Sequence, residues 1–354
     1  MQVNPRTRQK LQRFRQIRLG YVSLLILAAL LLLCLAAELL VNNRALIVKY
    51  EGGYYFPTYT EFHPGTDFGF DYAYETNYRD LRRRFVEEGG DNWVLMPIVP
   101  YSPFENDASD NVFKASPPSF EQRHFLGTDS TSRDILARLL YGTRIALVFA
   151  LLFMVCVYFV GISIGCAMGY FGGSFDLLFQ RFIEIWSNVP FLYMVIIVFS
   201  VIPGTFSLTG RIAILLIVMV LFSWTGMTYF MRTETYRQKA RDYIAAARVL
   251  GASHSRIIFK HILPNLLATL ITFMPFTIVG AITAITALDF LGFGLPPPTP
   301  SLGELLKQGT ANLRVAPWII VAAFSTLVML LTLVTFIGEA LREAFDPKKF
   351  TIYR

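Results

Sequence analysis

Six long apolar runs, each about the length of a membrane-spanning helix, divide the chain into alternating apolar and polar parts. A helix needs about 20 predominantly apolar residues to cross a bilayer. The runs cover residues 21–41, 145–168, 183–202, 212–230, 266–288 and 319–337. This pattern predicts an all-α polytopic membrane protein with six transmembrane helices.

Residues 42–126 differ from the rest because they contain no apolar run long enough to span a membrane. The region is rich in Tyr, Phe, Asp, Pro and Gly. It predicts a small, loop-rich insert between the first and second spans, with short strands around residues 54–59 and 94–99. Its three consecutive arginines, at positions 82–84, form either a solvated face or a contact patch for a partner.

Residues 127–144, which follow the insert, have the pattern of an amphipathic helix. Thr128 or Asp129 is suited to cap its start. The apolar residues that fall on one face of this helix are Ile135, Leu136, Leu139 and Leu140. We expect the helix to lie along the membrane surface before the chain enters the second span.

Composition and charge indicate which parts of the chain lie on each side of the membrane. The chain is 54% hydrophobic and only 16% charged, whereas soluble domains carry about 25% charged residues. The net charge of +7 does not indicate nucleic-acid binding, because the basic residues lie beside the apolar runs. They place both termini (residues 1–20 and 341–354) and the linker 232–265 in the cytoplasm. The insert and the loop 289–317 then lie outside, and Ser301 with Glu304 predicts a short helix in that loop.

The linker between the fourth and fifth spans contains the sequence DYIAAARVLGASHSRIIFKHILPN, residues 242–265. Ala245, Ala246 and Ala247 offer a helix face with very small side chains. Gly251 suits a helix C-terminus, Ser253 suits the N-cap of a second helix, and Pro264 should limit how far that helix runs. The stretch predicts a helix, a tight corner and a second helix, in which small side chains let another protein approach closely.

The chain lacks the motifs of common catalytic and nucleotide-binding sites. It has no phosphate-binding loop, no zinc-protease motif and no serine-hydrolase motif. The four histidines are scattered, the three cysteines lie in apolar runs, and few charges lie inside the spans. Transport would therefore be driven by another chain, or the protein would be a stand-alone channel or secondary carrier without an ATPase.

Three segments resemble motifs of ABC importer permeases of the dipeptide and oligopeptide branch. The linker resembles the "EAA" loop, EAA-x3-G-x9-I-x-LP, although Ala245 replaces the glutamate and His261 the isoleucine. Residues 126–147 resemble that branch's LGTD-x-x-GRD segment, with Ser132 in place of its glycine, and residues 288–306 resemble its loop before the last span. The aromatic insert resembles the Yej-type subgroup, linked to microcin C and oligopeptide uptake.

The resemblance implies a type I ABC importer permease in a bacterial inner membrane, acting as the second, "C-type" subunit. Its partners would be a homologous second permease, two ATPase domains or subunits and a periplasmic peptide-binding protein. The chain itself would be no enzyme and hold no cofactor, since ATP would bind the partner subunits. The permease core would comprise residues 145–340.

The resemblance also assigns roles to individual residues. The ATPase-coupling loop would include Ala245, Ala246, Ala247, Arg248, Gly251, Ala252, Ser253, Arg256, His261, Leu263 and Pro264. Polar or aromatic positions in the spans are candidates to line the pore: Ser187, Asn188, Ser223, Trp224 and Thr283. Alternatively, each of these five side chains serves helix packing.

Overall fold

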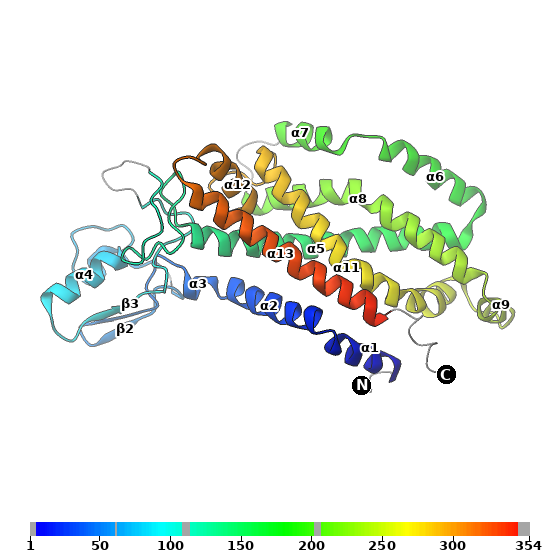
Figure 1. Cartoon of the computed structure of the whole chain (residues 1–354), viewed down its shortest axis with the longest axis horizontal. Helices are drawn as coiled ribbons and strands as arrows, with labels where there is room; N and C mark the ends of the chain where they lie inside the picture. The colour runs from blue at the N-terminus through cyan, green and yellow to red at the C-terminus, as the bar shows by residue number, and fades with distance from the viewer. Residues whose placement is uncertain (1–4, 61, 108–113, 202–206, 346–354) are drawn as a thin grey trace.

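A computed structural model describes residues 5–60, 62–107, 114–201 and 207–345, and the side chains from residue 9 onward. Long helices run side by side along the longest axis of the molecule (Figure 1). The insert lies at one end of this bundle, which we call the insert end. The linker (residues 232–265) lies at the opposite end, which we call the loop end. The outermost parts of the two predicted tails, 1–4 and 346–354, lie outside the described residues.

Five helices in the described part of the chain are long and apolar enough to cross a membrane. Helix α8 packs on α5, α5 on α11, α11 on α13, and α13 on α2. The bounds of these helices are α2 (Arg18–Leu35), α5 (Ile135–Phe171), α8 (Leu208–Lys239), α11 (Leu263–Leu291) and α13 (Pro317–Phe345). Two shorter helices, α1 (Pro5–Gln16) and α3 (Ala37–Leu40), flank α2.

The third predicted span is not one straight helix. Its residues belong to α6 (Gly173–Ser187) and α7 (Phe191–Val201), which are bent by 72° relative to each other. Pro190 lies in the break, where its missing N–H and its ring prevent the helix from continuing. The pair therefore makes a broken span or a re-entrant segment, and residue 202 at its predicted end lies outside the described residues.

The prediction of a separate surface helix at 127–144 is also wrong. Helix α5 begins at Ile135 and runs without interruption for 37 residues, so residues 135–144 are its first turns. Its N-cap is Asp134, whose carboxylate accepts a hydrogen bond from the Ala137 N–H at 2.8 Å. The apolar face seen in the sequence is real, but Ile135 and Leu139 bury it in the same core as Leu147. The amphipathic pattern thus marks the first turns of a span packed against other helices.

Glycines allow α5 and α8 to approach closely. Gly161, Gly165 and Gly169 recur every four residues and so share one face of α5. A Cβ atom added to Gly165 would lie 2.5 Å from the carbonyl oxygen of Thr228, and one on Gly169 would lie 2.6 Å from that of Arg232. Small residues at this spacing are typical of helix contacts in membranes, where dispersion forces between close backbones replace the hydrophobic effect.

The insert has its own small core. Its three-stranded antiparallel sheet has the order β2-β1-β3, and α4 packs beside β3 (Figure 1). Val48, Phe68, Leu81 and Phe85 fill the core between them. The element bounds are β1 (Ile47–Tyr50), β2 (Gly53–Tyr55), β3 (Trp93–Leu95) and α4 (Tyr78–Glu88). The structure confirms short strands near both predicted positions. It adds β1, which precedes both in the sequence and lies between them in the sheet.

The loop before the last span contains α12 (Leu302–Ala311), as the spacing of Ser301 and Glu304 predicts. The Ser301 hydroxyl accepts a hydrogen bond from the Glu304 N–H at 3.0 Å. Helix α12 packs against α11 and α13 at the insert end, so this part of the bundle is covered by protein.

Candidate functional site

The linker at the loop end has the predicted order of helix, glycine corner and serine cap. Helix α9 (Asp242–Val249) is followed by Gly251, whose φ of +77° lies in the left-handed region. The Ser253 hydroxyl then accepts a hydrogen bond from the N–H of Arg256 and caps α10 (His254–Arg256). A Cβ added to Gly251 would meet no atom within 4 Å. Glycine is therefore favoured here by backbone conformation, not by lack of space.

The sequence predicted that Pro264 would end the second helix, but the helix continues past it. A π-helical segment, η3 (Ile257–Ile262), carries it directly into α11, and Pro264 lies in the first turn of that helix. Proline is tolerated there because its missing N–H falls where the helical bonding pattern is already altered. The part of the linker from His254 onward is therefore a continuous extension of the fifth span.

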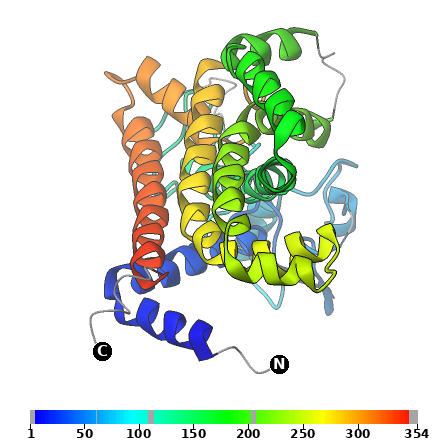
Figure 2. The same ribbon diagram turned by 90° about the vertical axis from the view of Figure 1, so that its right-hand side faces the viewer.

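One face of α9 and the corner after it is exposed and apolar. Val249 and Leu250 are 88% and 86% exposed, and Ala245 and Ala246 beside them are also exposed. Arg248 is exposed next to this surface. Figure 2, which looks at the loop end, shows α9 and α10 projecting beside the ends of the long helices. We call Ala245, Ala246, Val249 and Leu250 the α9 face.

The opposite side of the linker is held firmly by the bundle. Ile244 is fully buried and Ala247 is 8% exposed. The Nδ1 atom of His254 lies 2.8 Å from the hydroxyl of Tyr170 at the end of α5, and the Arg248 guanidinium lies 5.4 Å from the centre of that ring. The linker is thus attached to the end of α5 by side-chain contacts.

A second anchor at the loop end ties α6 to α8. The carboxylate of Asp176 accepts hydrogen bonds from two nitrogens of Arg232, at 2.5 and 2.7 Å, and one from the Tyr236 hydroxyl at 2.9 Å. Asp176 is only 5% exposed. A bidentate ion pair with a buried carboxylate restrains how the two helices lie relative to each other. Nothing in the local sequence around Asp176 predicts it.

The other predicted loop residues are distributed over both sides of the linker. Arg256 is exposed, while Ala252, His261 and Leu263 are half-buried. The Asn265 amide links the turn at His261 to α9, because it donates to the His261 carbonyl at 2.7 Å and to the Tyr243 hydroxyl at 3.1 Å.

A cavity of about 410 Å³ lies among α5, α7, α8 and α11. Ser223, one of the five pore candidates, lines it, and Thr277 contributes a second hydroxyl. The remaining lining residues are apolar or glycine: Phe153, Val157, Phe191, Met219, Met227, Gly280, Ala281 and Ala284.

The four other pore candidates do not line this cavity. Trp224 is buried against Ile183 and Met168 in a packing cluster. Ser187 and Asn188 lie exposed at the end of α6. Thr283 is exposed and donates its hydroxyl to the Val279 carbonyl at 2.8 Å.

The insert end holds a network of buried charges. Arg138 is fully buried and lies 3.4 Å from Asp129 and 2.5 Å from Glu304. Arg133 donates to Asp129 at 2.9 Å and to Glu304 at 3.2 Å. Two arginines therefore share two carboxylates, and the network joins the segment before α5, α5 itself and α12.

Ser132 has a backbone conformation that would suit the glycine of the motif that this segment resembles. Its φ is +62°, in the region that glycine adopts most easily. Its hydroxyl accepts a hydrogen bond from the Lys114 N–H at 2.9 Å and donates one to the Lys114 carbonyl at 3.0 Å. These two bonds offset the backbone strain and tie the end of the insert to the segment before α5.

His124 connects the insert to the first turn of α5. It is 2% exposed, and its ring nitrogens lie 2.8 Å from Asp134 and 3.2 Å from Asp107. Burial alone would lower the pKa of His124, but its hydrogen bonds to the two carboxylates raise that pKa to about 9. The ring is therefore protonated at neutral pH and is the centre of a three-membered ion cluster.

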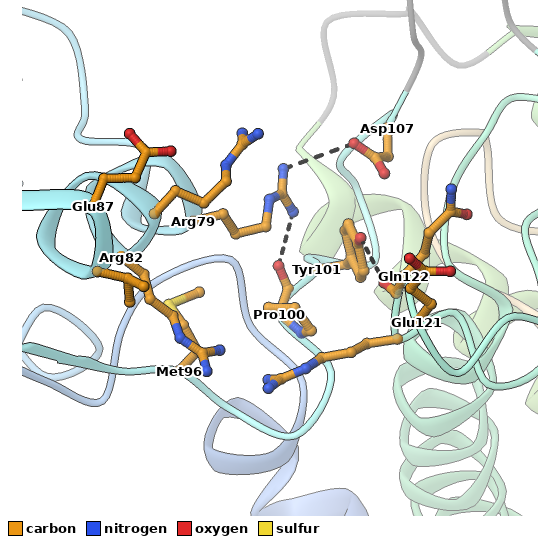
Figure 3. A pocket seen from close by; sticks show the side chains of 12 residues that line it. Arg79, Arg82, Glu87, Met96, Pro100, Tyr101, Asp107, Glu121 and Gln122 are labelled. Carbon is orange, nitrogen blue, oxygen red and sulfur yellow. Dashed lines mark hydrogen bonds and ion pairs between the residues drawn. The ribbon is translucent and has the colours of Figure 1, made fainter.

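A pocket of about 570 Å³ opens between α4 and the turn near Gln122 (Figure 3). Arg79 crosses its floor, donating to the Pro100 carbonyl at 2.8 Å and lying 3.9 Å from Asp107. On the facing wall, the Tyr101 hydroxyl donates to the Gln122 carbonyl at 2.8 Å. Asp107 also contacts His124, so this pocket borders the ion cluster.

The structure divides the arginine cluster of the insert. Arg82 and Arg83 are exposed and line the pocket, whereas Arg84 turns away and donates to Glu88 at 2.6 Å and to the Gly69 carbonyl at 2.9 Å. Arg84 therefore stabilises the insert itself. Arg83 pairs with Asp80 on its own helix but stays exposed, so Arg82 and Arg83 can still form a contact patch.

The comparison with known proteins identifies the class. Residues 161–351 match the family model described as "Binding-protein-dependent transport system inner membrane component". The chain belongs to this family, the permease subunits of ABC importers, and is a multi-pass inner-membrane transport component, not an enzyme. Membership supports the ABC importer over the stand-alone channel or carrier.

The most informative relatives are Yej-type permeases. The chain is 42% identical to the inner membrane ABC transporter permease protein YejE of Escherichia coli (strain K12), over 98% of each chain. It is 36% identical to the peptidoglycan transport system permease protein YejE of Agrobacterium fabrum, over 98% of this chain and 94% of the relative. The oligopeptide transport system permease protein OppC of Haemophilus influenzae is 33% identical over 72% of this chain and 80% of its own length. The near-complete overlap with the first two includes the insert, so the chain is of the Yej type.

Proposed function

We propose that this permease forms part of the transmembrane path for oligopeptides and is driven through the α9 face by ATPase subunits on the cytoplasmic side. The observation that carries the proposal is the contrast between the two sides of the linker. Val249 and Leu250 are almost fully exposed, while Ile244 behind them is fully buried. An exposed apolar surface on a firmly held helix suits the groove of a partner protein.

The anchors of the linker give it the rigidity that coupling needs. Force applied to α9 passes to α5 through His254 and Tyr170, and to α11 through the continuous helix from His254 to Leu291. The Asp176–Arg232 pair would carry the motion from α8 to α6. Alternating access then follows when ATP binding draws two such linkers together and rotates the attached helices as rigid bodies.

The peptide substrate is supported by the names of the relatives. Oligopeptide and dipeptide permeases are among them, and the Yej-type resemblance extends the proposal to microcin C-like peptides. The cavity lined by Ser223 and Thr277 would form part of the path. The partners would be a second homologous permease, two ATPase domains or subunits that hold the ATP, and a periplasmic peptide-binding protein. Both termini would lie in the cytoplasm with the linker.

The experiment replaces Gly251, the corner that sets the angle of α9. A β-branched residue is disfavoured at its φ of +77° by roughly 1–2 kcal/mol, whereas asparagine tolerates that conformation. We expect Gly251→Val to reduce peptide uptake by cells at least about tenfold, which corresponds to about 1.4 kcal/mol, while the permease still co-purifies with its ATPase. Gly251→Asn should retain most of the uptake. Normal uptake by Gly251→Val would show that the corner does not transmit the motion.

A further inference from the structure

A second polar cavity, separate from the α9 face and from the cavity lined by Ser223, lies at the loop end among α1, α8, α11 and α13. Its volume is about 530 Å³. Lys10, Arg237 and Arg342 bring positive charge from three different helices, and Glu234 is the one acidic residue among the described residues that line it. Asn265, Thr269 and Thr272 add uncharged hydrogen-bonding groups.

The basic groups of this cavity are only partly neutralised. Arg237 lies 3.2 Å from Glu234, and Lys10 lies 4.8 Å from the centre of the Phe345 ring. Arg342 has no ion-pair or hydrogen-bond partner within the part of the chain that the structure describes. Three cations against one carboxylate leave an excess positive charge that suits an anion.

The position of the cavity distinguishes a lipid from a soluble anion. It lies near the ends of three helices long and apolar enough to cross a membrane. The polar headgroups of a bilayer are expected beside such helix ends. Leu266, Ala268 and Phe345 make one wall apolar. Basic pockets between transmembrane helices attract anionic headgroups, and an apolar wall gives the acyl chains a surface.

The neighbouring helix α1 is suited to close the cavity from the membrane surface. Its sequence from Gln9 to Gln16 carries Lys10, Arg13 and Arg15 and no acidic residue. Phe14 anchors it, because this ring is 6% exposed and packs against Ile337 on α13. Figure 2 shows α1 passing beside the end of α13. We infer that the cavity binds the phosphodiester headgroup of an anionic phospholipid and so ties α1 to the bundle.

The test measures lipids retained by the purified full-length permease with native mass spectrometry. The probes are phosphatidylglycerol, phosphatidylethanolamine and inorganic phosphate. We expect preferential retention of phosphatidylglycerol, which Arg237→Gln with Arg342→Gln reduces roughly 30-fold, since each basic residue near a lipid surface accounts for about fivefold. Arg237→Lys with Arg342→Lys should restore retention. The matched control, Lys307→Gln with Arg314→Gln, removes the same charge from exposed positions at the insert end and should change nothing.

Two results would overturn the inference. Equal retention of phosphatidylglycerol by the charge-removing variant and the wild type, at unchanged thermal stability, would show that the cavity does not hold the headgroup. Displacement of the lipid by inorganic phosphate at millimolar concentration would point to a soluble anion. Neither result bears on coupling through α9, because none of the substituted residues belongs to the linker's α9 face.

Discussion

The two ends of the bundle differ in what they bury: the insert end buries paired charges, whereas the loop end leaves an apolar face exposed. At the insert end, Arg133 and Arg138 are buried with the carboxylates of Asp129 and Glu304, and α12 covers them. At the loop end, α9 is anchored on one side and leaves Val249 more than four-fifths exposed on the other.

This difference separates internal structure from a surface made for a partner. A buried ion network costs desolvation and is stable only when every charge is paired within the chain. An exposed apolar face, by contrast, gains free energy only when something covers it. The insert end therefore acts as a fixed frame, and the loop end is the place where an external protein can act on the helices.

The largest effect on this difference between the two ends should come from replacing Arg138 at the insert end. Arg138→Met leaves Asp129 and Glu304 with one fewer buried counter-charge, and we expect the free energy of unfolding to fall by about 3–5 kcal/mol. Denaturation of the purified chain in detergent measures it. The control on the same helix is Arg144→Met, because Arg144 pairs with Glu38 at 2.8 Å but is partly exposed. Its loss should cost less than about 1 kcal/mol, and equal losses would contradict the frame.

The pH dependence of stability tests the ion cluster around His124, where the insert joins the bundle. The pKa of His124 is raised from 6.5 to about 9, so its contribution to stability is complete below pH 6.5 and is lost as the pH rises through about 9. The pKa of Asp107 is lowered by its hydrogen bond to His124, so its contribution is lost only in acid. We expect the stability difference between wild type and His124→Gln, on the order of 3 kcal/mol at most, to shrink between pH 6.5 and 9.5. A difference that stays constant over this range would exclude a charged His124.

The smallest expected effect concerns the strained turn at Ser132. Ser132→Ala keeps the left-handed backbone and loses both hydrogen bonds to Lys114, which should cost about 1–2 kcal/mol. Ser132→Gly loses the same bonds but relieves the strain, so the change should stay within about 0.5 kcal/mol. Thermal unfolding of the two variants side by side checks this order. Equal destabilisation would mean that the backbone at this position is not strained.

Hydropathy and local turn chemistry were enough to predict much of this architecture. The apolar runs located the long helices, and Gly251 and Ser253 predicted the corner, because a left-handed glycine and an N-cap are encoded by single residues. The break at Pro190 and the uninterrupted α5 were missed, since a pattern of apolar positions does not distinguish a surface helix from the first turns of a packed span.

The anchors of the candidate site were beyond sequence reasoning for a different reason. His254 bonds Tyr170 across 84 residues, and Arg232 bonds Asp176 across 56. No local pattern marks such partners, because they become neighbours only when the helices pack. The ion network at the insert end was missed for the same reason, although its segment was recognised by its motif.

The central claim is that the α9 face is covered by an ATPase subunit, and site-specific photo-crosslinking tests it most directly. A photoreactive residue replaces Leu250, which is 86% exposed, and a control replaces Tyr74 in the insert, which is 67% exposed. In cells that take up peptide, the account predicts that position 250 crosslinks to a subunit carrying a phosphate-binding loop, and that position 74 does not. Transport-competent protein in which position 250 never crosslinks to such a subunit would contradict the account.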